Sequence, residues 1–179
     1  MRSVAGFLLS SVLLSAASIP SPVSRSSIIA MEKSFDKRID LIGLDDPFGI
    51  LGTTRGVYLD GYGVVFTTEL NLVQNAVLSP FRPAYTKEDL HRLRLKKLAR
   101  LEALKKNMRE MLVSSAASLD GVPAEEKIVL GINLFYYSWE DSAGLPRQVI
   151  MKAPKKALLE AMHGKTSDLD SSLNVQELN

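Results

Sequence analysis

The chain has 179 residues, of which 46% are hydrophobic and 23% charged, with 22 lysines and arginines against 20 aspartates and glutamates. It contains no cysteine, which excludes disulfides, cysteine-ligated zinc, iron–sulfur clusters and a cysteine nucleophile. The formal net charge of +2 does not by itself indicate a nucleic-acid partner.

The first 18 residues have the features of a secretory signal peptide. Arg2 gives a positive start, an uncharged apolar run spans residues 4–17, and small residues follow it. A membrane-spanning anchor needs about 20 apolar residues, whereas a signal peptide has an apolar region of about 7–15. We therefore expect export to a bacterial periplasm or the extracellular space, with cleavage near Ala17 or Ser18. An uncleaved anchor is the alternative. Residues 19–30 are expected to form a flexible leader.

Residues 31–165 are predicted to form a single α+β domain. Its first helix is expected at residues 31–44, where apolar side chains fall on one face. Two strands are expected between residues 50 and 73, because apolar residues alternate there and Asp60-Gly61 is typical of a hairpin turn. The chain left after cleavage is long enough to fold by core packing alone.

A long helix is expected from a cap at Thr86 to about Ser118. At roughly 45–50 Å it would exceed a typical strand of about 17–20 Å, so it should overhang one end of the sheet. Strands are expected at residues 127–139 and 147–153, followed by a short helix after Pro154. Residues 166–179 contain three acids and no base, and are expected to be disordered.

Two hairpins joined by a helix most simply form one antiparallel sheet, packed with three helices in the order α-β-β-α-β-β-α. This order is similar to that of profilin-like and roadblock-like domains. The similarity concerns element order alone, and no motif is shared. A similarity of fold says little about function.

The first candidate binding surface is a row of cations on the long helix. Arg92, Lys96 and Arg100 are four residues apart and therefore lie on one side of it. Such a row would dock on an anionic surface, for example lipid headgroups, or on an acidic protein partner. The alternative is a solvated helix face with local ion pairs. Export, and the lack of aromatic residues among these cations, argue against nucleic acid.

The second candidate surface is aromatic. Phe135, Tyr137 and Trp139 alternate along the third predicted strand and would share the face opposite its core face. Tyrosine and tryptophan are enriched at interfaces because they combine apolar area with a polar tip. If this face is bare, the stripe would contact a ligand or a protein. If a helix covers it, the three residues form a second core.

An alternative polar site is predicted on the first hairpin. Thr67, Glu69 and Asn71 are expected to point the same way, with Arg55 on the paired strand. These side chains could bind a small polar ligand, as in a small-molecule-binding domain or a hydrolase. Cross-strand polar pairs on a solvent face are the simpler interpretation.

Catalytic motifs are missing from the sequence. His91 and His163 stand alone, and no GxSxG, SxxK or kinase signature is present. We expect no metal and no cofactor, and a binding or interaction domain rather than an enzyme. A homodimer formed through a sheet edge or the long helix is a further hypothesis.

Overall fold

The computed structural model describes residues 23–42, 46–74 and 85–179. These ranges contain, in chain order, α1 (Arg25–Leu41), β1 (Gly49–Leu59), β2 (Gly63–Asn71), α2 (Lys87–Ser115), the 3-10 helix η1 (Ala116–Ser118), β3 (Lys127–Leu134), β4 (Gln148–Pro154), α3 (Lys155–Met162), α4 (Thr166–Ser172) and β5 (Asn174–Leu178). The predicted α+β class is confirmed. Of the helices in the described ranges, none is both long and apolar enough to cross a membrane.

The five strands form one sheet in the order β1-β2-β3-β4-β5. Three of the four neighbouring pairs are antiparallel, whereas β2 and β3 are parallel. The predicted fully antiparallel sheet is therefore wrong at its centre. The reason is the connection through α2, which returns the chain to the end of the sheet where β2 began, so that β3 runs in the same direction.

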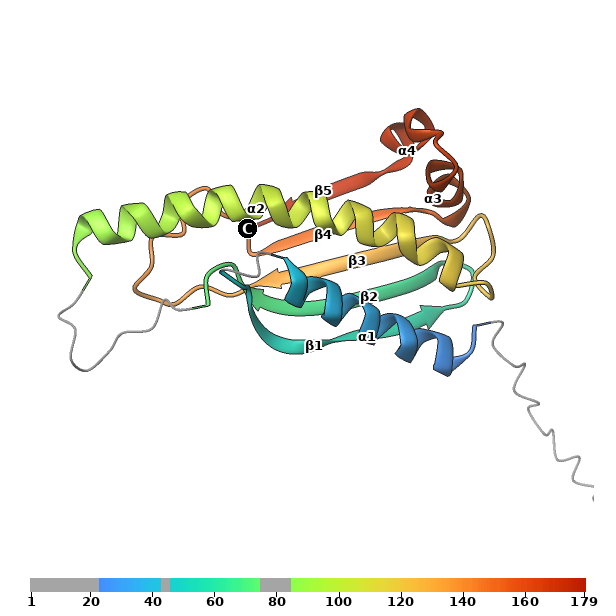
Figure 1. Cartoon of the computed structure of the whole chain (residues 1–179), viewed down its shortest axis with the longest axis horizontal. Helices are drawn as coiled ribbons and strands as arrows, with labels where there is room; N and C mark the ends of the chain where they lie inside the picture. The colour runs from blue at the N-terminus through green and yellow to red at the C-terminus, as the bar shows by residue number, and fades with distance from the viewer. Residues whose placement is uncertain (1–22, 43–45, 75–84) are drawn as a thin grey trace, which may run out of the picture.

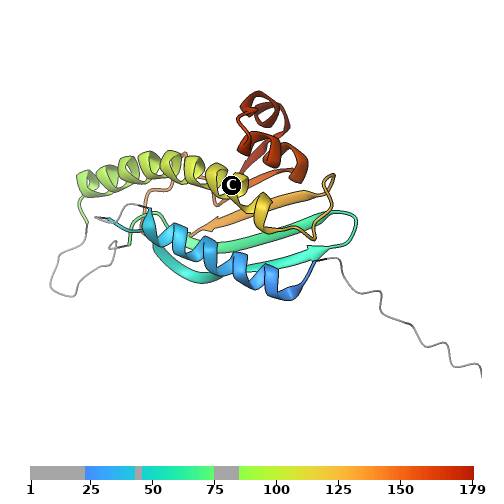
Figure 2. The same ribbon diagram turned by 45° about the vertical axis from the view of Figure 1, so that its right-hand side comes forward.

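Helices α1 and α2 lie on the same face of the sheet, and α3 and α4 lie at one end of it (Figures 1 and 2). Alternation along β2 reflects this arrangement. Val64, Phe66 and Leu70 are fully buried toward the helices, whereas Thr67 and Glu69 are exposed on the opposite face. The domain is thus a two-layer sandwich, and no described helix covers the second face of its sheet.

The first hairpin has the predicted turn. Gly61 has φ of +73°, a backbone conformation that glycine adopts without steric cost. Gly63 has φ of +128°, and a Cβ there would lie 1.9 Å from the carbonyl oxygen of Lys127. The second glycine therefore lets the start of β2 approach β3 closely.

Helix α1 begins six residues earlier than predicted, at Arg25, so the expectation of a flexible leader is wrong from that residue onward. Ser24 caps the helix by accepting a hydrogen bond from the Ser27 N–H at 3.1 Å. Ile28 then packs over Gly56 of β1, where an added Cβ would lie 2.6 Å from the Ile28 Cγ2. A cap and one apolar contact thus extend the helix into residues expected to be flexible.

Two acidic side chains of α1 bind the backbone of β1, which is an outer strand of the sheet. Glu32 accepts a hydrogen bond from the Gly56 N–H at 2.8 Å, and Asp36 accepts one from the Thr54 N–H at 2.8 Å. Unpaired N–H groups on an outer strand invite pairing with another chain. The helix therefore covers part of this sheet edge.

The C-terminal residues, expected to be disordered, form α4 and β5. Leu169 of α4 is 1% exposed and belongs to the hydrophobic core. Two acids of this segment bind cations of α2: Asp170 pairs with Arg109, and Glu177 with Lys105 at 2.8 Å. Two of the three acids that suggested disorder are thus partners of the basic helix, and β5 pairs with β4.

Lys155, the first residue of α3, secures the end of α2. Its ammonium group is buried and donates hydrogen bonds to the carbonyl oxygens of Leu119, Asp120 and Val122 at 2.8, 3.2 and 2.8 Å. These carbonyls follow η1, where helical hydrogen bonding has ended and acceptors need a partner.

Candidate functional site

The N-terminal half of α2 extends beyond the sheet, as its predicted length requires, and there it meets the loop between β3 and β4 (Figure 1). Its first turn is held by a capping box. The Thr86 hydroxyl accepts from the Asp89 N–H, and the Asp89 carboxylate accepts from the Thr86 N–H, both at 3.2 Å. The overhang is therefore a regular helix from its first residue.

A buried ion pair joins this overhang to the loop. Lys97 donates to the Glu140 carboxylate, and the two side chains are 1% and 2% exposed. The Lys97 ammonium also lies 4.9 Å from the ring centre of Tyr136, whose hydroxyl donates to the Pro146 carbonyl at 2.8 Å. Nearer the surface, Arg94 pairs with Asp141 at 3.2 Å. The loop is thus fixed on the helix by charge as well as by packing.

Burial is the largest influence on the pKa of Lys97 and on that of Tyr136. It lowers the pKa of Lys97, because it disfavours the ammonium ion, and the hydrogen bond and charge of Glu140 oppose that effect. Burial also raises the pKa of Tyr136, and the nearby Glu140 carboxylate adds to the increase. The tyrosine hydroxyl therefore remains a hydrogen-bond donor at neutral pH.

Four aromatic side chains lie in continuous contact on this loop and at the start of α2. Trp139 stacks with Tyr85 (ring centres 4.7 Å apart) and with Tyr137 (5.3 Å), and Tyr137 meets Phe135 edge-on at 5.0 Å. All four are half-buried. We call Phe135, Tyr137, Trp139 and Tyr85 the aromatic row.

The predicted trio of Phe135, Tyr137 and Trp139 is thus brought together, though by a different route from the one expected. Strand β3 ends at Leu134, so the three residues belong to the loop and not to a strand running to residue 139. Each is partly accessible, so the row is neither a bare strand face nor a second core.

Sequence reasoning missed the fourth member of the row, Tyr85. It directly precedes the Thr86 cap, a position from which apolar residues often pack back onto the first turn of the helix. That position was a usable signal for contact near the helix start. It gave no indication of Trp139 as the partner, because the two residues are far apart in the sequence.

The cation row of α2 is largely occupied by acids. Arg92 pairs with Asp89, while Lys96 and Arg100 both bind the Asp46 carboxylate, at 2.7 and 2.6 Å. Their side chains are 76%, 47% and 14% exposed, respectively. A hydrogen bond from Lys96 and the Arg100 charge lower the pKa of Asp46, against the opposing effect of burial. Most of the row therefore attaches the helix to the segment that enters β1.

The alternative polar site is only partly assembled. Arg55 lies opposite Thr67 in the β1–β2 register, and both are exposed with Glu69 on the uncovered face of the sheet. Asn71 does not join them. It is 4% exposed, and its side-chain oxygen accepts from the Val73 N–H at 3.1 Å. Asn71 thus serves the local turn that ends β2.

Comparison of the chain with protein-family models, curated proteins and solved structures finds no match. Across the described ranges, no group of three or more His, Cys, Asp or Glu side chains is arranged to hold a metal ion. The function must therefore be argued from the geometry of the chain itself.

Proposed function

We propose that this chain is an exported, non-enzymatic binding protein whose aromatic row contacts a protein partner. The observation that carries the proposal is the unbroken contact of the four half-buried, partly accessible rings. Tyrosine and tryptophan supply much of the binding energy at protein interfaces, where they cluster in well-packed groups. The N-terminal apolar run supports the export part of the proposal.

The row is supported by a rigid base. Directly after Trp139, Glu140 forms the buried ion pair with Lys97, and Tyr136 is tied to Pro146 within the same loop. Ordering of side chains and loops is one of the main costs of association. A loop already ordered in the free protein loses little freedom when a partner binds, which favours recognition by this surface.

The stacking of the rings and the ion pairs of the nearby cations favour a polypeptide as the partner, rather than nucleic acid or an anionic surface. Bases stack on free ring faces, but two tyrosine rings already occupy the indole of Trp139. Tyrosine and tryptophan each combine apolar ring area with a polar tip, which suits the backbone and side-chain acceptors of a protein. The nearby cations have acidic partners within the chain.

The test uses the single tryptophan of the chain, Trp139, as a reporter. A displayed library of random peptides is selected on the purified protein, and the enriched peptides are titrated while tryptophan emission is followed. We expect apolar or aromatic peptides that bind at micromolar concentration and change the emission. Tyr137→Ala should weaken them by about tenfold, and Tyr85→Ala serves as a second variant.

Tyr62→Ala is the matched control. This tyrosine is 38% exposed at the turn of the first hairpin, so its loss should leave peptide affinity unchanged. Enriched peptides that bind wild type and Tyr137→Ala equally would overturn the proposal. A dimer that dissociates on Tyr137→Ala, measured by light scattering, would make a second copy of the chain the occupant and would also overturn it.

A further inference from the structure

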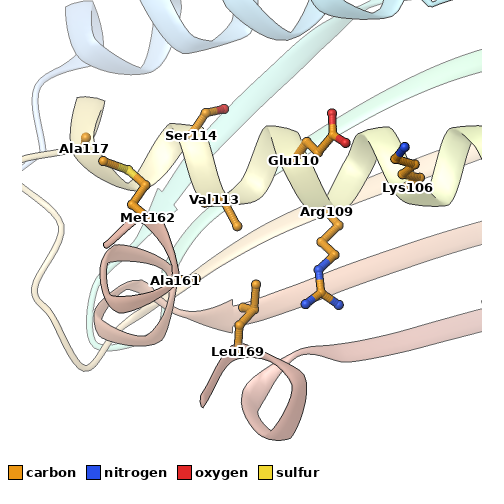
Figure 3. Close-up of a pocket in the computed structure, with 9 residues that line it drawn as sticks. All are labelled: Lys106, Arg109, Glu110, Val113, Ser114, Ala117, Ala161, Met162 and Leu169. Atoms are coloured by element: carbon orange, nitrogen blue, oxygen red, sulfur yellow. The ribbon is translucent and has the colours of Figure 1, made fainter. Parts of the chain in front are cut away.

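An apolar cleft lies between the C-terminal half of α2 and helices α3 and α4 (Figure 3). Its volume is about 660 Å³, within the range of roughly 300–1,000 Å³ typical of small-molecule pockets. Apolar side chains form most of its wall, namely Val113, Ala117, Ala161, Met162 and Leu169. Ala161 and Leu169 belong to the hydrophobic core, so the floor of the cleft reaches that core.

Charged side chains lie toward the other end of the cleft, away from Ala117 (Figure 3). Arg109 points toward α4, where it pairs with Asp170, whereas Glu110 points away from α4 (Figure 3). The paired side chains are 38% and 62% exposed, so solvent reaches them. An exposed ion pair of this kind contributes little stability, and a competing anion can replace its carboxylate at low cost.

We propose that this cleft binds an aliphatic monocarboxylate, with the chain along the apolar wall and the carboxylate on Arg109. The apolar wall selects an aliphatic chain, because burying it removes apolar surface from water. Asp170 indicates the head group, since a carboxylate already occupies the guanidinium, and Arg binds carboxylates through two parallel hydrogen bonds. The ligand carboxylate displaces Asp170 when it binds. This site is independent of the aromatic row.

Isothermal titration calorimetry with sodium dodecanoate, kept below its micelle concentration, tests the proposal on the purified protein. We expect saturable binding at one site, with dodecanol at least about tenfold weaker because it lacks the charge. Acetate lacks the chain and should give no binding. Arg109→Gln should weaken dodecanoate by about tenfold and leave dodecanol unchanged.

Asp170→Asn gives the sharpest test, because it removes the carboxylate that competes for Arg109. We expect it to tighten dodecanoate binding several-fold, whereas a merely structural role of Asp170 would weaken binding. Ala117→Trp should block the cleft without burying new volume in the core, since Ala117 is exposed. Arg92→Gln, at the far end of α2, is the matched control for loss of one cation.

Three results would overturn the inference. The first is a lack of saturable dodecanoate binding to wild type. The second is binding to Ala117→Trp as tight as to wild type, which would place the ligand elsewhere. Equal affinity for dodecanoate and dodecanol, with no effect of Arg109→Gln, would show that the cleft does not select a carboxylate. Unfolding curves of each variant confirm that the fold persists.

Discussion

Lys97 and Glu140 form a buried ion pair that joins α2 to the loop between β3 and β4. Removing one partner of such a pair leaves an uncompensated charge in the interior, which is more costly than losing the attraction itself. We therefore expect Lys97→Met to lower the free energy of unfolding by about 3–5 kcal/mol, measured by urea denaturation.

The double variant Lys97→Met with Glu140→Leu tests whether the loss comes from the charge left unpaired. Replacing both charges by apolar residues of similar size is often neutral or stabilising, so we expect it to recover most of the lost stability. Arg92→Met, at a position where the side chain is 76% exposed, should change stability by less than about 1 kcal/mol. A double variant as unstable as Lys97→Met alone would contradict this account.

The ionisation of Asp46 should make the free energy of unfolding depend on pH in the acid range. Its pKa in the folded chain lies below the ordinary value of 3.8, mainly because Lys96 donates a hydrogen bond to it. The carboxylate therefore stabilises the fold above that ordinary value, and the contribution is lost as pH falls through the lowered pKa. Asp46→Asn should cost about 1 kcal/mol at pH 6, and this cost should shrink as pH falls below the ordinary pKa of 3.8, measured by denaturation at each pH. A difference that stays constant with pH would refute it.

Single residues were predictable where a local rule governs them. Thr86 as a cap and Gly61 in a turn depend on neighbours in the sequence, and both are confirmed. Asn71 was expected to be exposed beside Thr67 and Glu69, but it is the last residue of β2 and is buried, with its side-chain oxygen accepting from the Val73 N–H in the turn that follows. The partnership of Lys97 with Glu140 links residues 43 positions apart, and no local pattern indicates it.

Helix α1 supplies a prediction at the scale of elements. Glu32→Ala removes the acceptor of the Gly56 N–H and should lower the unfolding free energy by about 1–3 kcal/mol. It also uncovers part of the β1 edge, so self-association should increase in sedimentation velocity runs. Lys33→Ala, on the exposed side of the same helix, is the control. Unchanged sedimentation of Glu32→Ala would exclude a role in edge protection.

Lys155, at the start of helix α3, gives a second prediction at the scale of elements. Replacing Lys155 with Met leaves the three carbonyls that follow η1 without their shared donor. We expect a loss of about 2–3 kcal/mol in thermal or chemical unfolding. Lys156→Met is the neighbouring control, because Lys156 is exposed. Equal stability of the two variants would mean that the carbonyls find other donors.

The elements with strong periodicity were predicted at the right places along the chain, because apolar alternation and caps act locally. Their ends were less accurate: α1 begins six residues earlier than expected, and β3 ends at Leu134 and not at residue 139. What failed depends on distant partners. Residues 166–179 lack an apolar pattern of their own, and they are ordered by Arg109, Lys105 and strand β4. The parallel pairing of β2 with β3 likewise follows from the path of α2, which spacing alone does not reveal.

At the scale of the whole molecule, the expected export of the chain can be tested directly. Expressed in a secreting host, the protein should appear outside the cytoplasm with a mass reduced by its first 17 or 18 residues, measured by intact-mass spectrometry. Leu13→Asp with Leu14→Asp should interrupt the apolar run and retain the full-length chain inside the cell. Full-length mass in the exported fraction would favour an uncleaved anchor instead.

The two edge strands of the sheet, β1 and β5, differ in how accessible they are to a strand from another copy of the chain. Carboxylates from α1 engage part of the β1 margin, whereas β5 forms the opposite margin with all five of its residues exposed. If two copies join by strand addition through β5, each uses its exposed β5 margin once and leaves outward the β1 margin, part of which is already bound by carboxylates of α1. Strand addition of this kind favours a closed pair over a filament.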